Sequence, residues 1–134
     1  MLAALDFVQG QPGVAPQRVG VLGVSLGAQI AIRAAAQSPG IQAVVADGTA
    51  IAVASDVPPP RSLKEVFYRI PSYLMDWGQA LKTSVIPPEG VVPSISKIAP
   101  RPVLLISTGH SAQLPDWELY MGQHLYAAAG QPKE

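Results

Sequence analysis

The sequence contains no cysteine, and this absence removes several kinds of chemistry at once. Without cysteine the chain forms no disulfide, offers no thiolate nucleophile and cannot bind zinc through sulfur. Its only histidines are His110 and His124, too few for a histidine-based metal centre. We therefore expect neither a metal nor another cofactor.

Charge is also scarce. Charged residues make up 13% of the 134 residues, and nine basic residues balance nine acidic ones. A chain without net charge has no overall field that would attract nucleic acid or an anionic membrane. The sequence is instead apolar over 49% of its length, which favours a well-buried globular segment over disorder.

Targeting signals are not found either. The first residues, MLAALDFVQG, lack a basic region and a long apolar core, so they do not form a signal peptide. The apolar run over 19–36 is divided by glycines and contains Arg33, which is costly near the centre of a membrane span. We expect no membrane segment in this chain and a cytoplasmic location.

The hydrophobic patterns that are present alternate between strand and helix. Short valine-rich runs over 18–24 and 41–47 are typical of strands covered on both faces in a parallel sheet. Between them a helical pattern begins at Leu26 and ends before SPG, which together predicts a right-handed βαβ unit. We also expect helices over 2–9 and 115–130 and a third strand over 101–108. The sequence therefore predicts one α/β domain over 1–134, with a parallel sheet of about three strands flanked by helices.

Residues 48–100 separate the second and third predicted strands. Ser62 and Glu65 form a capping box before an apolar helical pattern. We expect Pro71 to end that helix and a second short helix to begin at Ser72. Residues 82–100 contain several prolines, and we expect them to be irregular.

Ser25 stands at the centre of a Gly-x-Ser-x-Gly motif, where the first strand pattern gives way to the helix pattern. A nucleophilic serine must project from a strained turn, and Gly23 and Gly27 leave room for backbone that passes close by. The helix that follows directs its amides and the positive end of its dipole here, so the Leu26 amide would be one oxyanion donor. The motif predicts a nucleophile, although the same glycines suit a structural turn with an incidental serine.

These segments resemble the α/β-hydrolases, in particular bacterial hydrolases related to dienelactone hydrolases and serine aminopeptidases. The likeness lies in residues 2–36, in IQAVVADG, in IAPRPVLLISTG and in YAAAGQPKE. It implies a partial α/β-hydrolase fold with Ser25 as the nucleophile. It also implies reaction with an ester, thioester or amide carbonyl through an acyl-enzyme, so a small-molecule acyl substrate is the expected partner.

Such a serine needs a histidine base that a carboxylate orients. By the resemblance, the acid follows the strand PVLLIST, where Asp116 and Glu118 are available and the spacing to LYAAAG slightly favours Glu118. Both residues also suit the first turn of the last helix, as a cap or as a charge on its dipole. Asp47, which ends the second strand, is a third candidate because some hydrolases of this fold carry the acid there.

The histidine departs from the family pattern, in which it lies beyond a further strand. His124 falls in the middle of a predicted helix, and His110 directly follows the third strand without the spacing expected of the base. The chain thus resembles the middle of a hydrolase truncated at both ends. We expect little esterase activity from it alone, restoration by the downstream codons, and self-association through exposed sheet edges.

Residues 48–100 also occupy the place where α/β-hydrolases insert lid elements. Most of the aromatic surface of the chain lies there, and it would favour an acyl or aromatic substrate if it covers the serine. The same side chains would serve equally to bury two helices against the sheet. The residues concerned are Phe67, Tyr68, Tyr73, Leu74 and Trp77.

Two other classes of function remain open. A nucleotide-binding βαβ module would use the glycine-rich turn, with Asp47 on the ribose, but the glycines are not spaced G-x-G-x-x-G. Protection by NAD without labelling by a fluorophosphonate would favour that module. A non-catalytic hydrolase-like scaffold would fit the departure at the histidine.

Overall fold

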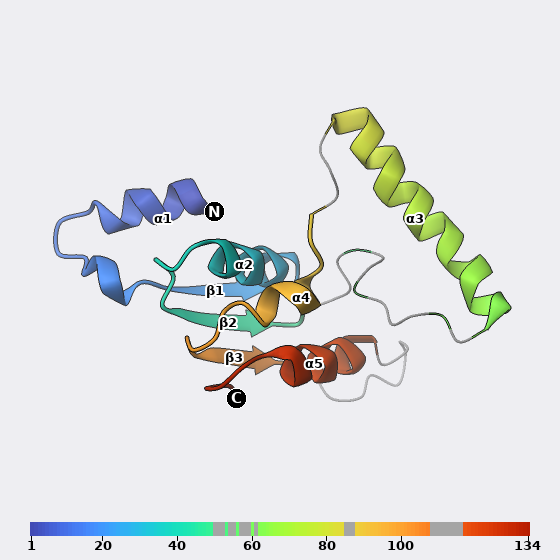
Figure 1. Cartoon of the computed structure of the whole chain (residues 1–134). Coiled ribbons are helices and arrows are strands. Elements are labelled where there is room, and N and C mark those ends of the chain that lie inside the picture. The colour runs from blue at the N-terminus through green and yellow to red at the C-terminus, as the bar shows by residue number, and fades with distance from the viewer. Residues whose placement is uncertain (50–52, 54–55, 57–59, 61, 85–87, 108–116) are drawn as a thin grey trace.

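The computed structural model describes residues 1–49, 53, 56, 60, 62–84, 88–107 and 117–134. Strands β1 (Gly20–Val24), β2 (Ala43–Asp47) and β3 (Val103–Ile106) form one parallel sheet in that order (Figure 1). The α/β class and the predicted three-stranded parallel sheet are confirmed. Val24 pairs with Asp47, and Asp47 with Ile106, so the carboxyl ends of all three strands lie side by side.

Helices flank this sheet in the order that the sequence predicts, with two additions. Helix α1 (Leu2–Gln9) precedes β1, α2 (Leu26–Gln37) connects β1 to β2, and α5 (Trp117–Ala128) follows β3. The additions are the short 3-10 helix η1 (Pro16–Arg18) before β1 and α4 (Val91–Ile95), which lies within a segment expected to be irregular. Burial explains α4, because Val91 and Ile95 are fully buried between α2 and α5. The tertiary contacts, rather than helix propensity, fix this turn.

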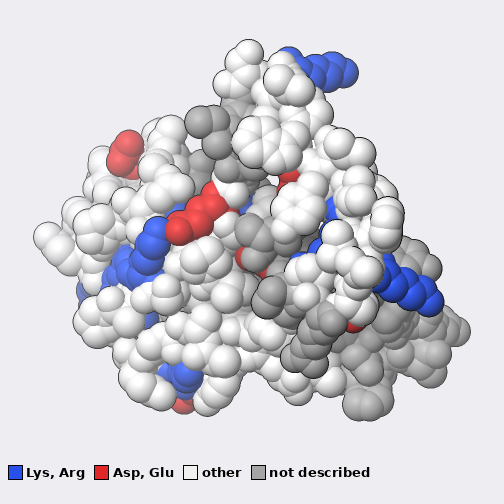
Figure 2. Space-filling view, turned by 45° about the vertical axis from the view of Figure 1, so that its right-hand side comes forward, with Lys and Arg blue, Asp and Glu red and all other residues white. Residues whose placement is uncertain are grey.

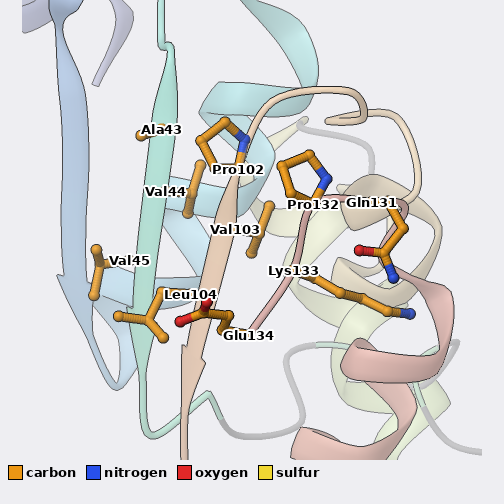
Figure 3. Close-up of a pocket in the computed structure, with 10 residues that line it drawn as sticks. All are labelled: Ala43, Val44, Val45, Pro102, Val103, Leu104, Gln131, Pro132, Lys133 and Glu134. Atoms are coloured by element: carbon orange, nitrogen blue, oxygen red, sulfur yellow. The ribbon is translucent and has the colours of Figure 1, made fainter.

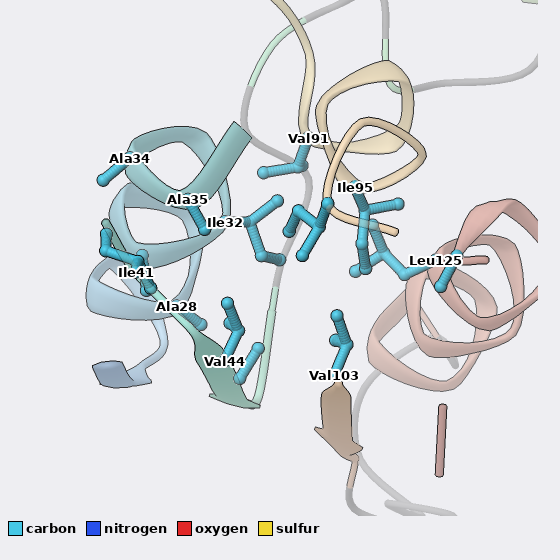
Figure 4. Packing of buried hydrophobic residues seen from close by; sticks show 14 of the residues in the cluster. Ala28, Ile32, Ala34, Ala35, Ile41, Val44, Val91, Ile95, Val103 and Leu125 are labelled. Carbon is cyan, nitrogen blue, oxygen red and sulfur yellow. The ribbon is translucent and has the colours of Figure 1, made fainter. Parts of the chain in front are cut away.

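The core lies on one face of the sheet. Side chains from α1, α2, α4, α5 and alternate strand positions meet there, as Figure 4 shows for most of them. The largest fully buried apolar side chains are Ile32, Ile41, Val44, Val91, Ile95, Ile98, Met121 and Leu125.

The opposite face of the sheet is open, which corrects the expectation of strands covered on both faces. Leu22 and Val24 are 67% and 58% exposed, and Leu104 and Ile106 are exposed as well. The cause is that α2, α4 and α5 all contribute to the core on the other face. A period of two along each strand therefore divides buried from exposed side chains.

The two outer strands differ at their free edges. On β3 the expectation of unpaired backbone is wrong, because the Val103 amide donates to the Pro132 carbonyl and the Leu105 amide to that of Glu134. The end of the chain thus runs parallel to β3. On β1 no described segment pairs with the outer edge, and self-association through that edge stays a prediction.

Helix α3 (Leu63–Thr83) is one continuous helix, which corrects the predicted break at Pro71. Ser62 Oγ accepts a hydrogen bond from the Glu65 amide, as the capping box predicts. Pro71 removes only one backbone hydrogen-bond donor from the helix. Ile70 and Leu74, on either side of it, are four positions apart and so lie on the same side of one continuous helix. Figure 1 shows α3 standing apart from the sheet, and none of the described helices is both long and apolar enough to span a membrane.

Candidate active site

Ser25 lies at the turn between β1 and α2, with φ 53° and ψ −117°. Few residues other than glycine adopt such a conformation, which costs about 1–3 kcal/mol and persists only where the surroundings impose it. Here the Ser25 amide donates to the Asp47 carbonyl at 2.7 Å, and the Ser25 carbonyl accepts from the Ala28 amide at 3.0 Å. The backbone is therefore held from both sides, and the residue is exposed to solvent.

The Ser25 hydroxyl does not cap the helix, although Ser25 is the N-cap residue of α2. Serine at this position ordinarily accepts a hydrogen bond from the first turn. The Leu26 amide donates to no described residue. The exposed hydroxyl and this amide thus stand together at the positive end of the α2 dipole, where an oxyanion would be stabilised.

Gly23 allows this turn to close. A β-carbon on residue 23 would lie 2.6 Å from the Ala28 amide nitrogen and closer still to the Gly27 carbonyl. No side chain fits there unless the backbone moves. At Gly27 the expected steric reason is wrong, because a β-carbon would meet no described atom within 4 Å.

The three candidate acids differ in how much of each the structure describes. The main chain of Asp47 is bonded to Ser25, and its half-buried side chain lies at the carboxyl end of β2. Glu118 belongs to the first turn of α5, but its side chain is outside the description, and Asp116 lies outside the described residues altogether. The assignment of the acid stays a prediction.

The two histidines also differ. The His124 ring contacts the Tyr120 ring, with centroids 3.9 Å apart, and its Nδ1 lies 2.8 Å from the Tyr120 carbonyl oxygen. These contacts within α5 fit a packed side chain rather than a base. His110 lies outside the described residues.

The predicted substrate-lining residues lie on α3, away from the sheet. Phe67, Tyr73 and Trp77 are 71%, 45% and 61% exposed, and no other described element packs extensively against their helix. The side chain of Tyr68 is not described. The structure does not bring these residues against Ser25, and their role in substrate binding stays a prediction.

Sequence reasoning passed over Thr49 and Asp56. Thr49 follows β2 at the same edge as Ser25, and its buried hydroxyl has no hydrogen-bond partner among the described residues. Asp56 is buried and accepts from the Val92 amide at 3.1 Å and the Val53 amide at 3.3 Å. It joins the start of the 48–100 segment to α4. In the sequence, the sign of this role is that Asp56 is an acidic residue among mostly apolar neighbours.

A pocket of about 500 Å³ lies at the other end of the strands (Figure 3). Its walls are the amino-terminal halves of β2 and β3 and the end of the chain, Gln131, Pro132, Lys133 and Glu134. Ser25 is not part of it. Among the described residues no cluster of three or more His, Asp or Glu could hold a metal ion.

Solved structures share this architecture. A hypothetical protein from Pseudomonas aeruginosa aligns with a TM-score of 0.64 and 19% identity, over 99% of this chain and 56% of its own. The α/β-hydrolase GrgF from Penicillium sp. sh18 gives 0.63 and 16%, over 99% and 58%. A glucuronoyl esterase from Solibacter usitatus gives 0.54 and 18%, over 93% and 33%. The chain therefore has an α/β-hydrolase fold. It spans just over half the length of the first two structures and a third of the length of the esterase.

A more particular likeness comes from a family model. The family described as BAAT / acyl-CoA thioester hydrolase C terminal matches residues 2–66, just under half of the chain. That span contains β1, the Ser25 turn, α2 and β2. No curated protein matches the sequence.

Proposed function

We propose that the chain belongs to a serine hydrolase that cleaves an ester or thioester through an acyl-enzyme on Ser25. The observation that carries this proposal is the positive φ of an exposed serine between a parallel strand and a helix, with its hydroxyl not used as a cap. A merely structural turn has no need of that strain. The match of residues 2–66 to an acyl-CoA thioester hydrolase family supports a thioester in particular.

The proposed reaction begins with attack of Ser25 Oγ on the acyl carbonyl. The negative charge that develops on the carbonyl oxygen faces the Leu26 amide and the N-terminus of α2. The alcohol or thiol then leaves, and water releases the acid from the ester on Ser25. A histidine base is needed for both steps. His124 is engaged by Tyr120 and does not serve as that base, and no other histidine lies among the described residues. The orienting acid is Glu118, Asp116 or Asp47.

The direct test is covalent labelling by a fluorophosphonate probe, which reacts with activated serines. We expect the adduct on Ser25, identified by mass spectrometry of the digested protein, and its loss in Ser25→Ala. The matched control is Ser84→Ala. Ser84 is also an exposed serine with positive φ, but it stands at the C-terminal end of α3, which is the negative end of the helix dipole.

Hydrolysis is the second readout. We expect turnover of p-nitrophenyl esters and acyl-CoA thioesters by the reading frame extended with its flanking codons, and its loss in Ser25→Ala. Single variants Asp47→Asn, Asp116→Asn and Glu118→Gln would then identify the acid by the largest fall in kcat. Equal turnover with alanine at position 25 would overturn the proposal, and the absence of both labelling and turnover would favour the non-catalytic scaffold.

A further inference from the structure

Thr49 has a buried hydroxyl group without a hydrogen bond. The residue is 5% exposed, and in the part of the chain that the structure describes its Oγ1 has no donor or acceptor within reach. Such groups are rare in folded proteins, because burying a hydroxyl without a partner costs free energy. Ser94 shows the usual arrangement, since this residue is 2% exposed and its Oγ donates to the Gly90 carbonyl at 2.7 Å. The hydroxyl of Thr49 therefore calls for a role.

The hydrogen bonds at the end of β2 fix the position of Thr49. β2 is the middle strand of the sheet. Its Asp47 carbonyl accepts from the Ser25 amide on the β1 side, and the Gly48 amide donates to the Ile106 carbonyl at 2.9 Å on the β3 side. Gly48 has a φ of 63°, so the chain turns there as it leaves the sheet. Thr49 thus comes directly after the last residues that bond to both neighbouring strands, at the edge that carries Ser25.

The proposed reaction requires a histidine at this same place. Ser25 follows β1, whereas two of the candidate acids, Asp116 and Glu118, follow β3. An imidazole that accepts a proton from the serine and is held by such an acid has to extend over the end of β2, because β2 separates the other two strands. If the acid is instead Asp47, its carboxylate belongs to β2 itself, two residues before Thr49. With either arrangement Thr49 borders the histidine and the acid.

We propose that Thr49 is a positioning residue, whose hydroxyl donates a hydrogen bond to the carboxylate that orients the catalytic histidine. This inference rests on the proposed function. An ionised carboxylate accepts several hydrogen bonds, and the imidazole N–H supplies only one of them. A charge-assisted bond from the hydroxyl fixes the orientation of the carboxylate and, through it, that of the imidazole ring. The same bond gives the buried Oγ1 of Thr49 its partner.

A neutral donor suits this role better than a cation does. A lysine or arginine beside the carboxylate would offset the negative charge that stabilises the protonated histidine, whereas a hydroxyl leaves that charge in place. Cations are also scarce in this protein. The chain has nine basic residues, and Figure 2 shows the charged side chains scattered among uncharged ones on the face in view.

The test measures hydrolysis by the extended reading frame with substitutions at Thr49. Thr49→Val keeps the shape of the side chain and removes the hydroxyl. We expect kcat to fall by about tenfold or more with KM unchanged, because the histidine is less well oriented while substrate binding is not affected. Thr49→Ser keeps the hydroxyl and should recover most of kcat. The matched control is Thr83→Val, which removes a hydroxyl that donates to the Gln79 carbonyl on α3 and should leave both constants unchanged.

A double-mutant cycle tests whether Thr49 acts through the acid. The acid is the residue whose amide variant, Asp47→Asn, Asp116→Asn or Glu118→Gln, gives the largest fall in kcat. In that variant the carboxylate is already lost, so adding Thr49→Val should cause almost no further fall. Urea midpoints of all variants show whether each one folds as the wild type does.

Three results would overturn this inference alone. The first is an unchanged kcat in Thr49→Val, and the second is a fall in kcat that Thr49→Ser does not recover or that comes with a lower urea midpoint. The third is losses that multiply in the double variant, because two independent effects would then be at work. Turnover that survives Ser25→Ala, or no turnover in the wild type, would instead overturn the proposed function, and this inference with it.

Discussion

The backbone of Gly27 lies so close to Gly23 that a β-carbon on residue 23 would overlap its carbonyl group. This contact joins the end of β1 to the first turn of α2 and so fixes the position of Ser25 between them. It also makes Gly23 the steric requirement of the motif, whereas residue 27 has open space around it.

Gly23→Ala should therefore open the turn. We expect a loss of about 2 kcal/mol or more in the free energy of unfolding, as for an overpacked core position, together with loss of fluorophosphonate labelling. Gly27→Ala is the matched control, and alanine there should be neutral or slightly stabilising because it favours the helix. Urea denaturation and labelling measure the two effects. Equal behaviour of both variants would contradict the geometry of this turn.

The strain at Ser25 gives a second prediction. Glycine adopts the conformation of this residue without steric cost, whereas alanine does not. Ser25→Gly should therefore be more stable than Ser25→Ala by about 1 kcal/mol, although both lose the nucleophile. The same pair of substitutions at Ser84, whose φ is 56°, should differ in the same direction. If alanine and glycine at position 25 give the same urea midpoint, the backbone is not held as described.

The parts of the fold that the sequence predicts are those with local signals. Glycine and proline mark the ends of the elements in the β1–α2–β2 unit, and the Gly-x-Ser-x-Gly motif marks the turn between β1 and α2. Helix α4 has no such signal, because Val91 and Ile95 become helical through burial between α2 and α5. The open face of the sheet could not be foreseen for a related reason. An apolar strand shows that it favours burial but not which elements will cover it.

Arg101 is another residue whose role depends on distant parts of the chain. Its guanidinium donates hydrogen bonds to the carbonyl oxygens of Ala35, Ser38, Ile41 and Ile98, at 2.7–3.0 Å. It thus satisfies the C-terminal carbonyls of α2 and joins them to the turn after α4. Partners some sixty positions away leave no pattern around residue 101 in the sequence.

Arg101→Lys should destabilise the protein even though the charge is kept. A lysine ammonium is a compact donor group and cannot reach four carbonyls in the planar arrangement of a guanidinium. We expect a loss of about 2 kcal/mol in urea denaturation, since half-buried carbonyls would be left without partners. Arg18→Lys, at an exposed residue, should be neutral. A neutral Arg101→Lys would mean that water replaces these bonds without cost.

The end of the 48–100 segment is attached through Glu89. Its main-chain carbonyl accepts from Arg33 Nε at 2.8 Å, and its carboxylate pairs with Lys97 Nζ at 2.7 Å. The hydrogen bonds from Lys97 hold the pKa of Glu89 below its usual value of 4.5. A lowered pKa in the folded state means that the unfolded chain takes up the proton more readily. The pair therefore stabilises the fold above the usual pKa and loses this effect as the pH falls through the folded value.

Lys97→Met should return the pKa of Glu89 towards its usual value. The measurement is an NMR titration of the Glu89 side-chain carboxyl carbon in the wild type and the variant, with Lys64→Met as the control for loss of a lysine elsewhere. Because both side chains of the pair are about half exposed, added salt should reduce the difference between the two proteins. An unchanged pKa in Lys97→Met would show that Lys97 does not bond this carboxylate.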